Sequence, residues 1–317
     1  MKWRRNGWVA LVCLAPALAV LGSFQVAPLF YAVNVSLHSG ALAGNEWVGL
    51  ANYRALVGER AFWQSLEVTF WYVLGTVPLT LLVAYWIAEL LNRDIRGRDV
   101  YRVLFFMPYV VSPVASSAVW KWIFNASSQV NLWLDKRGFE VRDQVWLLQP
   151  RGLFTLLGEL WGVDVPSWAG GPSLALCCIM VVSIWTMLGF AVVILLAGLS
   201  QVPTEVLEAA QLDGASGWRL RRRIIWPLLS PTLFFLLIIF IIKAFQAFNS
   251  IYVMTPGGLS GRTATVTFYI YESAFMAGGR GTGFGSAVSL VLLTVILALT
   301  FIQFRVLGRR VHYGGAA

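Results

Sequence analysis

The chain has 317 residues, of which 58% are hydrophobic and 12% are charged, and its formal net charge is +9. Soluble domains carry about 25% charged residues, so this composition excludes an ordinary soluble protein and indicates a polytopic membrane protein. The basic residues lie mostly between apolar runs, which points to orientation in a membrane and to anionic lipid rather than to nucleic acid.

Six apolar runs reach the length of about 18 residues that a spanning helix needs. Hydrocarbon offers no water to the backbone, so we predict that each run is a helix. No alternating strands of about ten residues appear, which disfavours a barrel. The fold class is thus an all-α polytopic membrane protein with six transmembrane helices. The predicted spans are 8–30, 68–91, 103–124, 173–200, 228–249 and 284–304.

The first span follows Lys2, Arg4 and Arg5, a pattern that a cleavable signal peptide shares. The apolar run is longer than the usual signal core of 7–15 residues, so a retained helix is favoured.

Basic residues predict the orientation, because they are enriched in cytoplasmic loops. One side holds more of them than the other, which places both termini in the cytoplasm. The richer side has Lys2, Arg4, Arg5, Arg93, Arg96, Arg98, Arg102, Arg219, Arg221, Arg222, Arg223, Arg305, Arg309 and Arg310. The opposite side has Arg54, Arg60, Lys136, Arg137, Arg142, Arg151, Arg262 and Arg280.

Two external segments have distinct compositions. The longer one, 125–172, is rich in Trp, Gly and Pro, and we expect a folded element on the membrane surface. Its tryptophans form either an aromatic belt or a partner contact; they are Trp133, Trp146, Trp161 and Trp168. The other segment, 251–283, has glycine clusters at 255–258 and 278–281, which we interpret as turns.

Cysteine, histidine and lysine usage limits the chemistry. Cys13, Cys177 and Cys178 lie inside apolar runs, and the only histidines are His38 and His312, so neither a disulfide framework nor a metal site is expected. No lysine follows a glycine, so the chain lacks a G-x-x-x-x-G-K-[ST] phosphate loop. An ATPase acting with this protein would be another polypeptide.

Between the fourth and fifth spans lies a polar, basic segment, EAAQLDGASGWRLRRRIIWP at 208–227. Pro203 and Thr204 predict a helix start, with Glu205 near the positive end of the helix dipole. Gly214 is a natural C-cap, because glycine takes the left-handed conformation without steric cost.

A second short helix is expected at 217–225, capped by Ser216 and with its arginines facing water or lipid phosphates. Pro227 and Pro231 are expected to end it and to begin the fifth span. The alternative interpretation of the whole segment is a solvated amphipathic connector.

The spacing of this segment resembles the cytoplasmic coupling loop of binding-protein-dependent ABC importer permeases, where a membrane subunit meets a separate ATPase. One departure is Trp226, which stands where the family usually has Leu. The matching residues, which the resemblance assigns to ATPase coupling, are Glu208, Ala209, Ala210, Asp213, Gly214, Ala215, Ile224 and Pro227.

The resemblance extends along the chain to the first permease of sugar or glycerol-3-phosphate importers. The matching stretches are 48–53, 62–66, 92–97, 108–112, 120–125, 252–258 and 269–272. It implies the architecture of a type I importer permease in a bacterial or archaeal inner membrane. The implied partners are a second homologous permease, two ATPase subunits that bind ATP and Mg²⁺, and an extracytoplasmic solute-binding protein.

The resemblance also implies a domain organisation and a cargo path. The first span and its outer loop occupy 1–65, the permease core occupies 66–307 with the coupling loop at 201–231, and a cytoplasmic tail follows at 308–317. In the maltose importer the sugar pocket is lined by the helices on either side of the coupling loop. The corresponding positions are Ser183, Thr186, Met187 and Phe190 on the first helix, and Phe240, Ala244 and Ala247 on the second. The last three lack polar side chains, which disfavours maltose itself as the cargo.

Polar residues lie beside the second face, namely Lys243, Gln246 and Asn249. A charge near mid-membrane generally faces a cavity or a partner. Lys243 is either a cationic contact for an acidic or phosphorylated cargo, or a side chain that snorkels outward or pairs with an acid of the partner permease. We prefer the second interpretation, because Lys243 lies in the outer half of its helix.

Other side chains have plain structural interpretations. Glu89 is expected to pair with Arg93 four residues on. Four aromatic residues are candidates for stacking on a sugar ring, although helix packing is the more common role; they are Trp185, Phe190, Phe245 and Phe248.

The main functional hypothesis is a transport subunit that forms half of a path for a sugar or oligosaccharide, with glycerol-3-phosphate or an acidic saccharide as the alternative cargo. A membrane-embedded enzyme needs ionisable residues that converge inside the bilayer, and only Glu89, Lys121 and Lys243 approach that region. The sequence has no segment that resembles a selectivity filter, which disfavours a stand-alone ion channel. A channel would also leave the coupling loop unexplained.

Overall fold

The computed structural model describes residues 2–40, 46–125, 129–138, 146–166, 169–256, 261–276 and 278–308. The chain divides into two compact units, Met1–Phe62 with Tyr269–Val295, and Trp63–Phe268 with Ile296–Ala317. Several predicted features lie outside the described residues, namely those at Arg142, Trp168, Gly257, Gly258 and the tail from Arg309.

The first unit combines helices from the N-terminal part of the chain with helices from a segment near its C-terminal end. It contains α1 (Lys2–Leu21), a π-helical turn (Gly22–Val26), α2 (Ala27–Ser36), α3 (Ala51–Gly58), the end of α14 (Val266–Phe275) and the start of α15 (Thr282–Val306). Thr282 donates a hydrogen bond from its hydroxyl to the Gly40 carbonyl at 2.9 Å, and Arg280 forms an ion pair with Glu59. Gly278 and Gly281 have positive φ, as predicted for a turn.

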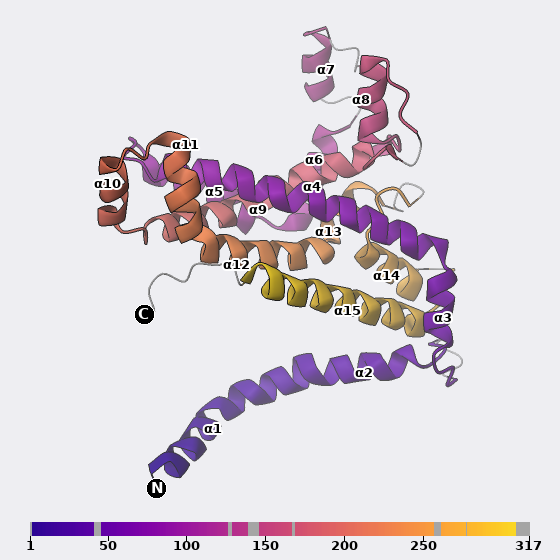
Figure 1. Ribbon diagram of the computed structural model, residues 1–317. Helices are drawn as coiled ribbons and strands as arrows, with labels where there is room; N and C mark the ends of the chain where they lie inside the picture. The colour runs from indigo at the N-terminus through magenta and orange to yellow at the C-terminus, as the bar shows by residue number, and fades with distance from the viewer. Residues whose placement is uncertain are drawn as a thin grey trace. The chain divides into compact units, whose positions relative to one another are not determined.

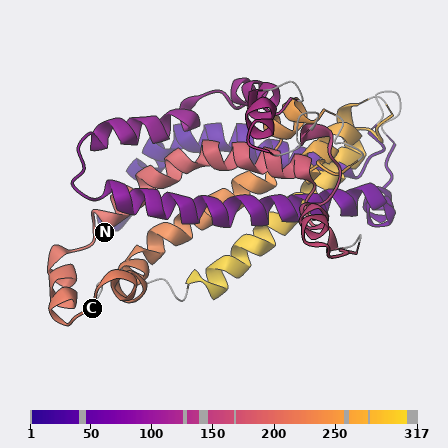
Figure 2. The same ribbon diagram turned by 90° about the horizontal axis from the view of Figure 1, so that it is seen from above.

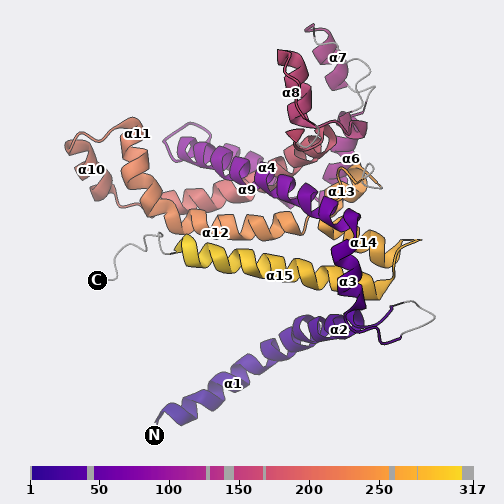
Figure 3. The ribbon, with the colours of Figure 1, turned by 45° about the vertical axis from the view of Figure 1, so that its right-hand side comes forward.

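The second unit holds a large cluster of buried hydrophobic residues. Its long helices, drawn in Figure 1, are α4 (Arg60–Leu91), α5 (Arg98–Val110), α9 (Leu174–Leu199) and α12 (Trp226–Phe245). Figures 1 and 3 show α10 (Thr204–Leu212) and α11 (Gly217–Leu220) at one end of this unit, with α6 (Pro113–Ile123) and α13 (Asn249–Met254) at the other.

The predicted external element between the third and fourth spans is folded. It contains α7 (Gln129–Asp135), a 3₁₀ turn (Trp146–Leu148) and α8 (Leu153–Trp161). The indole of Trp146 donates a hydrogen bond to the side chain of Asn131, which is fully buried. The aromatic belt and the partner contact both stay predictions for the tryptophans of this element.

Five helices within the described residues are long and apolar enough to cross a membrane, and a bent helix pair makes a sixth span if counted as one. The prediction of helical spans is therefore confirmed. The five are Trp8–Ser36, Arg60–Leu91, Leu174–Leu199, Gly217–Phe245 and Thr282–Val306.

The third predicted span, 103–124, is not one helix. It is split into α5 and α6, which meet at an angle of 97°. The cause is Pro113, because a proline disfavours the helical conformation of the residue before it. Ser112 accordingly leaves the helical region, with ψ 126°, as does the extended Val111 before it, and Pro113 occupies the first turn of α6.

Gly189 lets α9 approach α5 closely. A Cβ added at Gly189 would lie 2.2 Å from the carbonyl oxygen of Phe105 and 2.8 Å from the Cα of Phe106. Backbone atoms cannot move aside as the end of a flexible side chain can, so this contact requires glycine.

We expect Gly189→Ala to lower the free energy of unfolding by about 1–3 kcal/mol, because the added methyl group overpacks the α5–α9 contact. The measurement is denaturant unfolding in detergent, followed by tryptophan fluorescence. Gly58→Ala is the control, since a Cβ there meets nothing within 4 Å. Equal midpoints for the two variants would contradict the packing argument.

Candidate functional site

The polar segment between α9 and α12 forms an arm, residues 201–225. Its first helix, α10, begins at Thr204 as predicted and ends in a left-handed turn. Gly214 has φ +76°, its N–H donates to the Gln211 carbonyl at 2.9 Å, and the Ala215 N–H donates to the Ala210 carbonyl at 2.8 Å. These two bonds are the Schellman pattern, which satisfies the last carbonyls of a helix.

This turn explains part of the sequence signature. Asp213 is the C-cap, Gly214 supplies the left-handed residue, and Ala210 is buried while its carbonyl closes the turn. The side chains of Glu208 and Ala209 are exposed, and only the Ala209 backbone takes part in the helix end, where its carbonyl accepts the Asp213 N–H at 3.0 Å.

The exposed face of α10 continues to Leu212, which sequence analysis did not select. Glu205, Glu208 and Leu212 share this face by helical spacing, and the Leu212 side chain is 89% exposed. Among the exposed large apolar residues that the structure describes, Leu212 has the highest exposed fraction. Its signal in the sequence was its position directly before Asp213 and Gly214.

The second half of the arm differs from its prediction. Helix α11 continues through a π-helical turn, Arg221–Ile225, directly into α12, so that Gly217–Phe245 is one helix. Pro227 and Pro231 lie inside that helix and do not end it. The Ser230 hydroxyl donates to the Pro227 carbonyl at 2.6 Å, replacing the N–H that Pro231 lacks. Ser216 stands at the N-cap, without a side-chain capping bond.

One arginine of the arm is not on a solvated face. Arg221 pairs with Glu89 of α4, with its Nη2 2.7 Å from Glu89 Oε1 and its Nε 2.7 and 2.9 Å from the two carboxylate oxygens. The predicted pairing of Glu89 with Arg93 is therefore wrong. The π turn carries Arg221 onto α4, a contact across 132 residues that local spacing cannot reveal.

Trp226 packs within this unit, as an aromatic residue in a partly buried position. Its ring centroid lies 4.9 Å from that of Trp218 and 5.8 Å from that of Tyr85, both edge-on. The tryptophan that replaces the family's usual Leu at this position therefore packs against two neighbouring aromatic rings.

A cavity of about 440 Å³ lies between the helices that flank the arm, with contributions from α4, α5 and α13. Seven of the nine side chains predicted for a cargo path line it, together with Tyr72, Tyr109 and Asn249. The seven are Ser183, Thr186, Met187, Lys243, Ala244, Gln246 and Ala247.

The two remaining predicted residues pack behind the cavity wall. Phe240 is fully buried, and Phe190 lies between it and Tyr109, stacked on the Tyr109 ring at 5.1 Å. Among the other aromatic candidates, Phe248 lines the cavity, Phe245 is buried, and Trp185 meets Trp120 edge-on.

Lys243 is directed into this cavity. Its Nζ donates to the Tyr109 hydroxyl at 3.1 Å and lies 4.9 Å from the Tyr109 ring centroid and 5.3 Å from that of Phe190. These contacts hold the ammonium group against two aromatic faces. No acidic side chain among the described residues forms an ion pair with it. The lysine is exposed and adds a positive charge to the cavity wall, and its outward snorkelling or pairing with an acid of the partner permease stays a prediction.

Tyr72 and Ser183 join α4 to α9 at the cavity. Their hydroxyl oxygens are 2.6 Å apart, and the Ser183 hydroxyl also contacts the Ile179 carbonyl at 3.0 Å. Because Ser183 donates to that carbonyl, Tyr72 donates to Ser183. Tyr72 and Tyr109 were both missed by sequence analysis, since each looks like an ordinary membrane aromatic residue.

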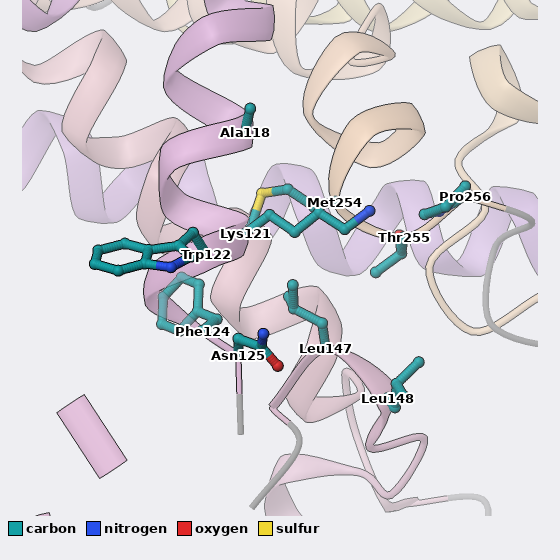
Figure 4. Close-up of a pocket in the computed structure, with 10 residues that line it drawn as sticks. All are labelled: Ala118, Lys121, Trp122, Phe124, Asn125, Leu147, Leu148, Met254, Thr255 and Pro256. Carbon is teal, nitrogen blue, oxygen red and sulfur yellow. The ribbon is translucent and has the colours of Figure 1, made fainter. Parts of the chain in front are cut away.

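A second cavity, of about 480 Å³, lies where α6 and α13 end. Figure 4 shows Lys121 extending from α6 towards Met254 and Thr255, and its Nζ donates to the Val253 carbonyl at 3.0 Å. The α6–α13 pair therefore has one cavity at each end. The Ser117 hydroxyl donates to the Ser250 hydroxyl at 3.2 Å and joins the two helices. No metal-binding group of His, Cys, Asp or Glu occurs among the described residues.

We expect Tyr72→Phe to lower the free energy of unfolding by about 0.5–1.5 kcal/mol, the net contribution of one hydrogen bond. Ser183 keeps its bond to Ile179, so no buried donor is left unpaired. Denaturant unfolding in detergent measures the effect. Tyr101→Phe, at an exposed tyrosine of α5, is the control and should change nothing measurable; an equal loss in both variants would contradict the bond's role.

The family described as "Binding-protein-dependent transport system inner membrane component" matches residues 76–313. The sn-glycerol-3-phosphate transport system permease protein UgpA of Agrobacterium fabrum is 30% identical over 271 residues, covering 85% of this chain and 84% of its own length. The trehalose/maltose transport system permease protein MalF of Thermococcus litoralis is 29% identical, covering 95% and 94%.

A solved structure shares the fold. The crystal structure of a bacterial alginate ABC transporter, in complex with an alginate pentasaccharide-bound periplasmic protein, matches with a TM-score of 0.78 at 18% identity over 99% of both chains. The curated relatives are transport permeases and not enzymes. The chain therefore belongs to the family of inner-membrane components of binding-protein-dependent transport systems, as a multi-pass permease subunit of an ABC importer.

Proposed function

We propose that this chain forms one half of the cargo path of an ATP-driven importer for a sugar or oligosaccharide. The observation that carries the proposal is the continuity of one segment, in which α9 and α12 line the cavity and the arm joins them. The cavity, at about 440 Å³, has the size of a small-molecule site. Hydroxyl and amide groups of Ser183, Thr186 and Gln246 suit a saccharide.

The assembly that we propose contains a second homologous permease, two ATPase subunits that bind ATP and Mg²⁺, and an extracytoplasmic solute-binding protein. The membrane is a bacterial or archaeal inner membrane, with both termini and the arm on the cytoplasmic side. The proposed functional divisions are residues 1–65, the core 66–307 with its arm, and the tail. Support comes from the family and from the transport systems named for its relatives.

Arm docking on the ATPase is proposed through the eight signature residues and Leu212. We expect Leu212→Asp to weaken co-purification of the ATPase with the permease about tenfold or more, because a charge would replace an apolar anchor at the tip of the arm. Leu148→Asp is the control, since Leu148 is also an exposed leucine but lies at the second cavity, away from the arm. Undiminished co-purification of the Leu212 variant would contradict this docking face.

Lys243 favours an anionic member of the cargo class, an acidic saccharide or glycerol-3-phosphate. The supporting observation is its unpaired charge at the cavity, and UgpA is named for glycerol-3-phosphate transport. Lys243 is exposed at the cavity and has no acidic partner among the described residues, so an anionic ligand would gain a charge-assisted bond and ionic attraction there. A neutral sugar would gain only one hydrogen bond from it.

We expect Lys243→Met to reduce uptake of an anionic cargo about tenfold or more, the effect of losing a hydrogen bond to a charged group. Uptake of a neutral sugar should fall only about two- to threefold, the low end of the net contribution of one hydrogen bond. The measurement is uptake of radiolabelled cargo by vesicles that contain the whole importer. Lys121→Met is the control, because Lys121 lines the other cavity. Equal losses for anionic and neutral cargoes would show that Lys243 does not select charge.

A further inference from the structure

The ion pair between Glu89 and Arg221 joins α4 to the π-helical turn of the arm at short distances and in a partly buried position. Three nitrogen–oxygen distances lie between 2.7 and 2.9 Å, and the Glu89 and Arg221 side chains are only 15% and 21% exposed. A guanidinium and a carboxylate that meet through two parallel bonds fix direction as well as distance. The pair therefore resists both separation and rotation of the elements that carry it.

Aromatic side chains surround this pair. The guanidinium carbon of Arg221 lies 5.2 Å from the Trp86 ring centroid, and Tyr85 packs edge-on against Trp226. A groove of about 350 Å³ between α4, α11 and α12 is lined by Leu81, Leu82, Tyr85, Trp86, Trp218, Trp226 and Leu233. Partial exclusion of water strengthens the attraction of the two charges.

The pair lies where the arm meets two helices, α4 and α12, that both extend to the cavity. Arg221 lies in the π turn where the arm runs into α12, and the same helix continues to Lys243 and Ala244 at the cavity. Glu89 lies at the end of α4 that meets the arm, and α4 also carries Tyr72 to the cavity. Figure 2 shows the arm from a second side, beyond the end of α12.

We propose that Glu89 and Arg221 are positioning residues that make the arm move α4 and α12 together. Displacement of the arm reaches α12 through the continuous helix, and the ion pair passes it to α4. Both walls of the cavity then change position in the same step. This inference rests on the proposed function, in which an ATPase displaces the arm.

Without the pair, α12 would follow the arm while α4 stayed behind. ATP would still be hydrolysed, but fewer cycles would open the cavity to release cargo. The signature of lost transmission is therefore more ATP hydrolysed per cargo molecule imported. A merely structural role would lower the amount of assembled importer, and with it hydrolysis and uptake in parallel.

The test uses the complete importer in liposomes, with ATP hydrolysis and cargo uptake measured on the same preparation. The main variant is Glu89→Gln with Arg221→Gln, because removing both charges avoids leaving one buried and unpaired. Arg222→Gln is the matched control, since it removes the same charge one residue away at an exposed position of the same turn.

We expect the double variant to raise the ratio of ATP to cargo about fivefold or more, the scale of a typical coupling between sites, while Arg222→Gln leaves it within about twofold. A ratio equal to that of the wild type, or an equal rise in the control, would overturn the inference. If the double variant does not assemble, Arg221→Lys decides, because it keeps the charge and loses the two-bond geometry. Its ratio should rise at least about twofold, and an unchanged ratio would overturn the inference.

Failure of the proposed function would look different. A wild-type importer whose ATP hydrolysis does not respond to cargo-loaded binding protein would contradict coupling itself. A wild-type importer that responds, with a double variant of unchanged ratio, would contradict only the role of the ion pair.

Discussion

The fold depends on one constraint: a backbone in hydrocarbon must satisfy its own hydrogen bonds. This constraint makes each apolar run a helix and makes every proline inside a run a local problem. The structure meets the problem in two ways. At Ser112 and Pro113 the helix breaks, and at Pro231 the Ser230 hydroxyl replaces the missing N–H. The break bends one predicted span through 97°, whereas the repair lets the arm continue into α12.

That continuity gives the arm its mechanical meaning. A flexible connector would absorb displacement, but a helix that runs from Gly217 to Phe245 carries it to the cavity. The Schellman turn at Gly214 fixes the direction of α10 at the other end of the arm. Ala210 and Gly214 build this turn, whereas the side chains of Glu208 and Ala209 are exposed beside it.

Apolar runs and local turn chemistry predicted most of the spans and the first helix of the arm, because these depend on residues close together in the chain. The resemblance to importer permeases, and not helical periodicity, placed Ser183 and Thr186 on a face that lines the cavity. Prediction failed where partners are distant in the chain. Glu89 had a plausible partner four residues away, and only the three-dimensional fold reveals Arg221. Tyr72 and Tyr109 were missed for the same reason, since their polar tips matter only through Ser183 and Lys243.

The central claim is that this chain converts ATP hydrolysis in a partner into passage of a saccharide through its cavity. The most direct measurement is the rate of ATP hydrolysis by the importer reconstituted in lipid, with and without cargo-loaded binding protein. The account predicts that hydrolysis rises with loaded binding protein only when this permease is present. Stimulation of the same size in an assembly that lacks this chain would contradict the account.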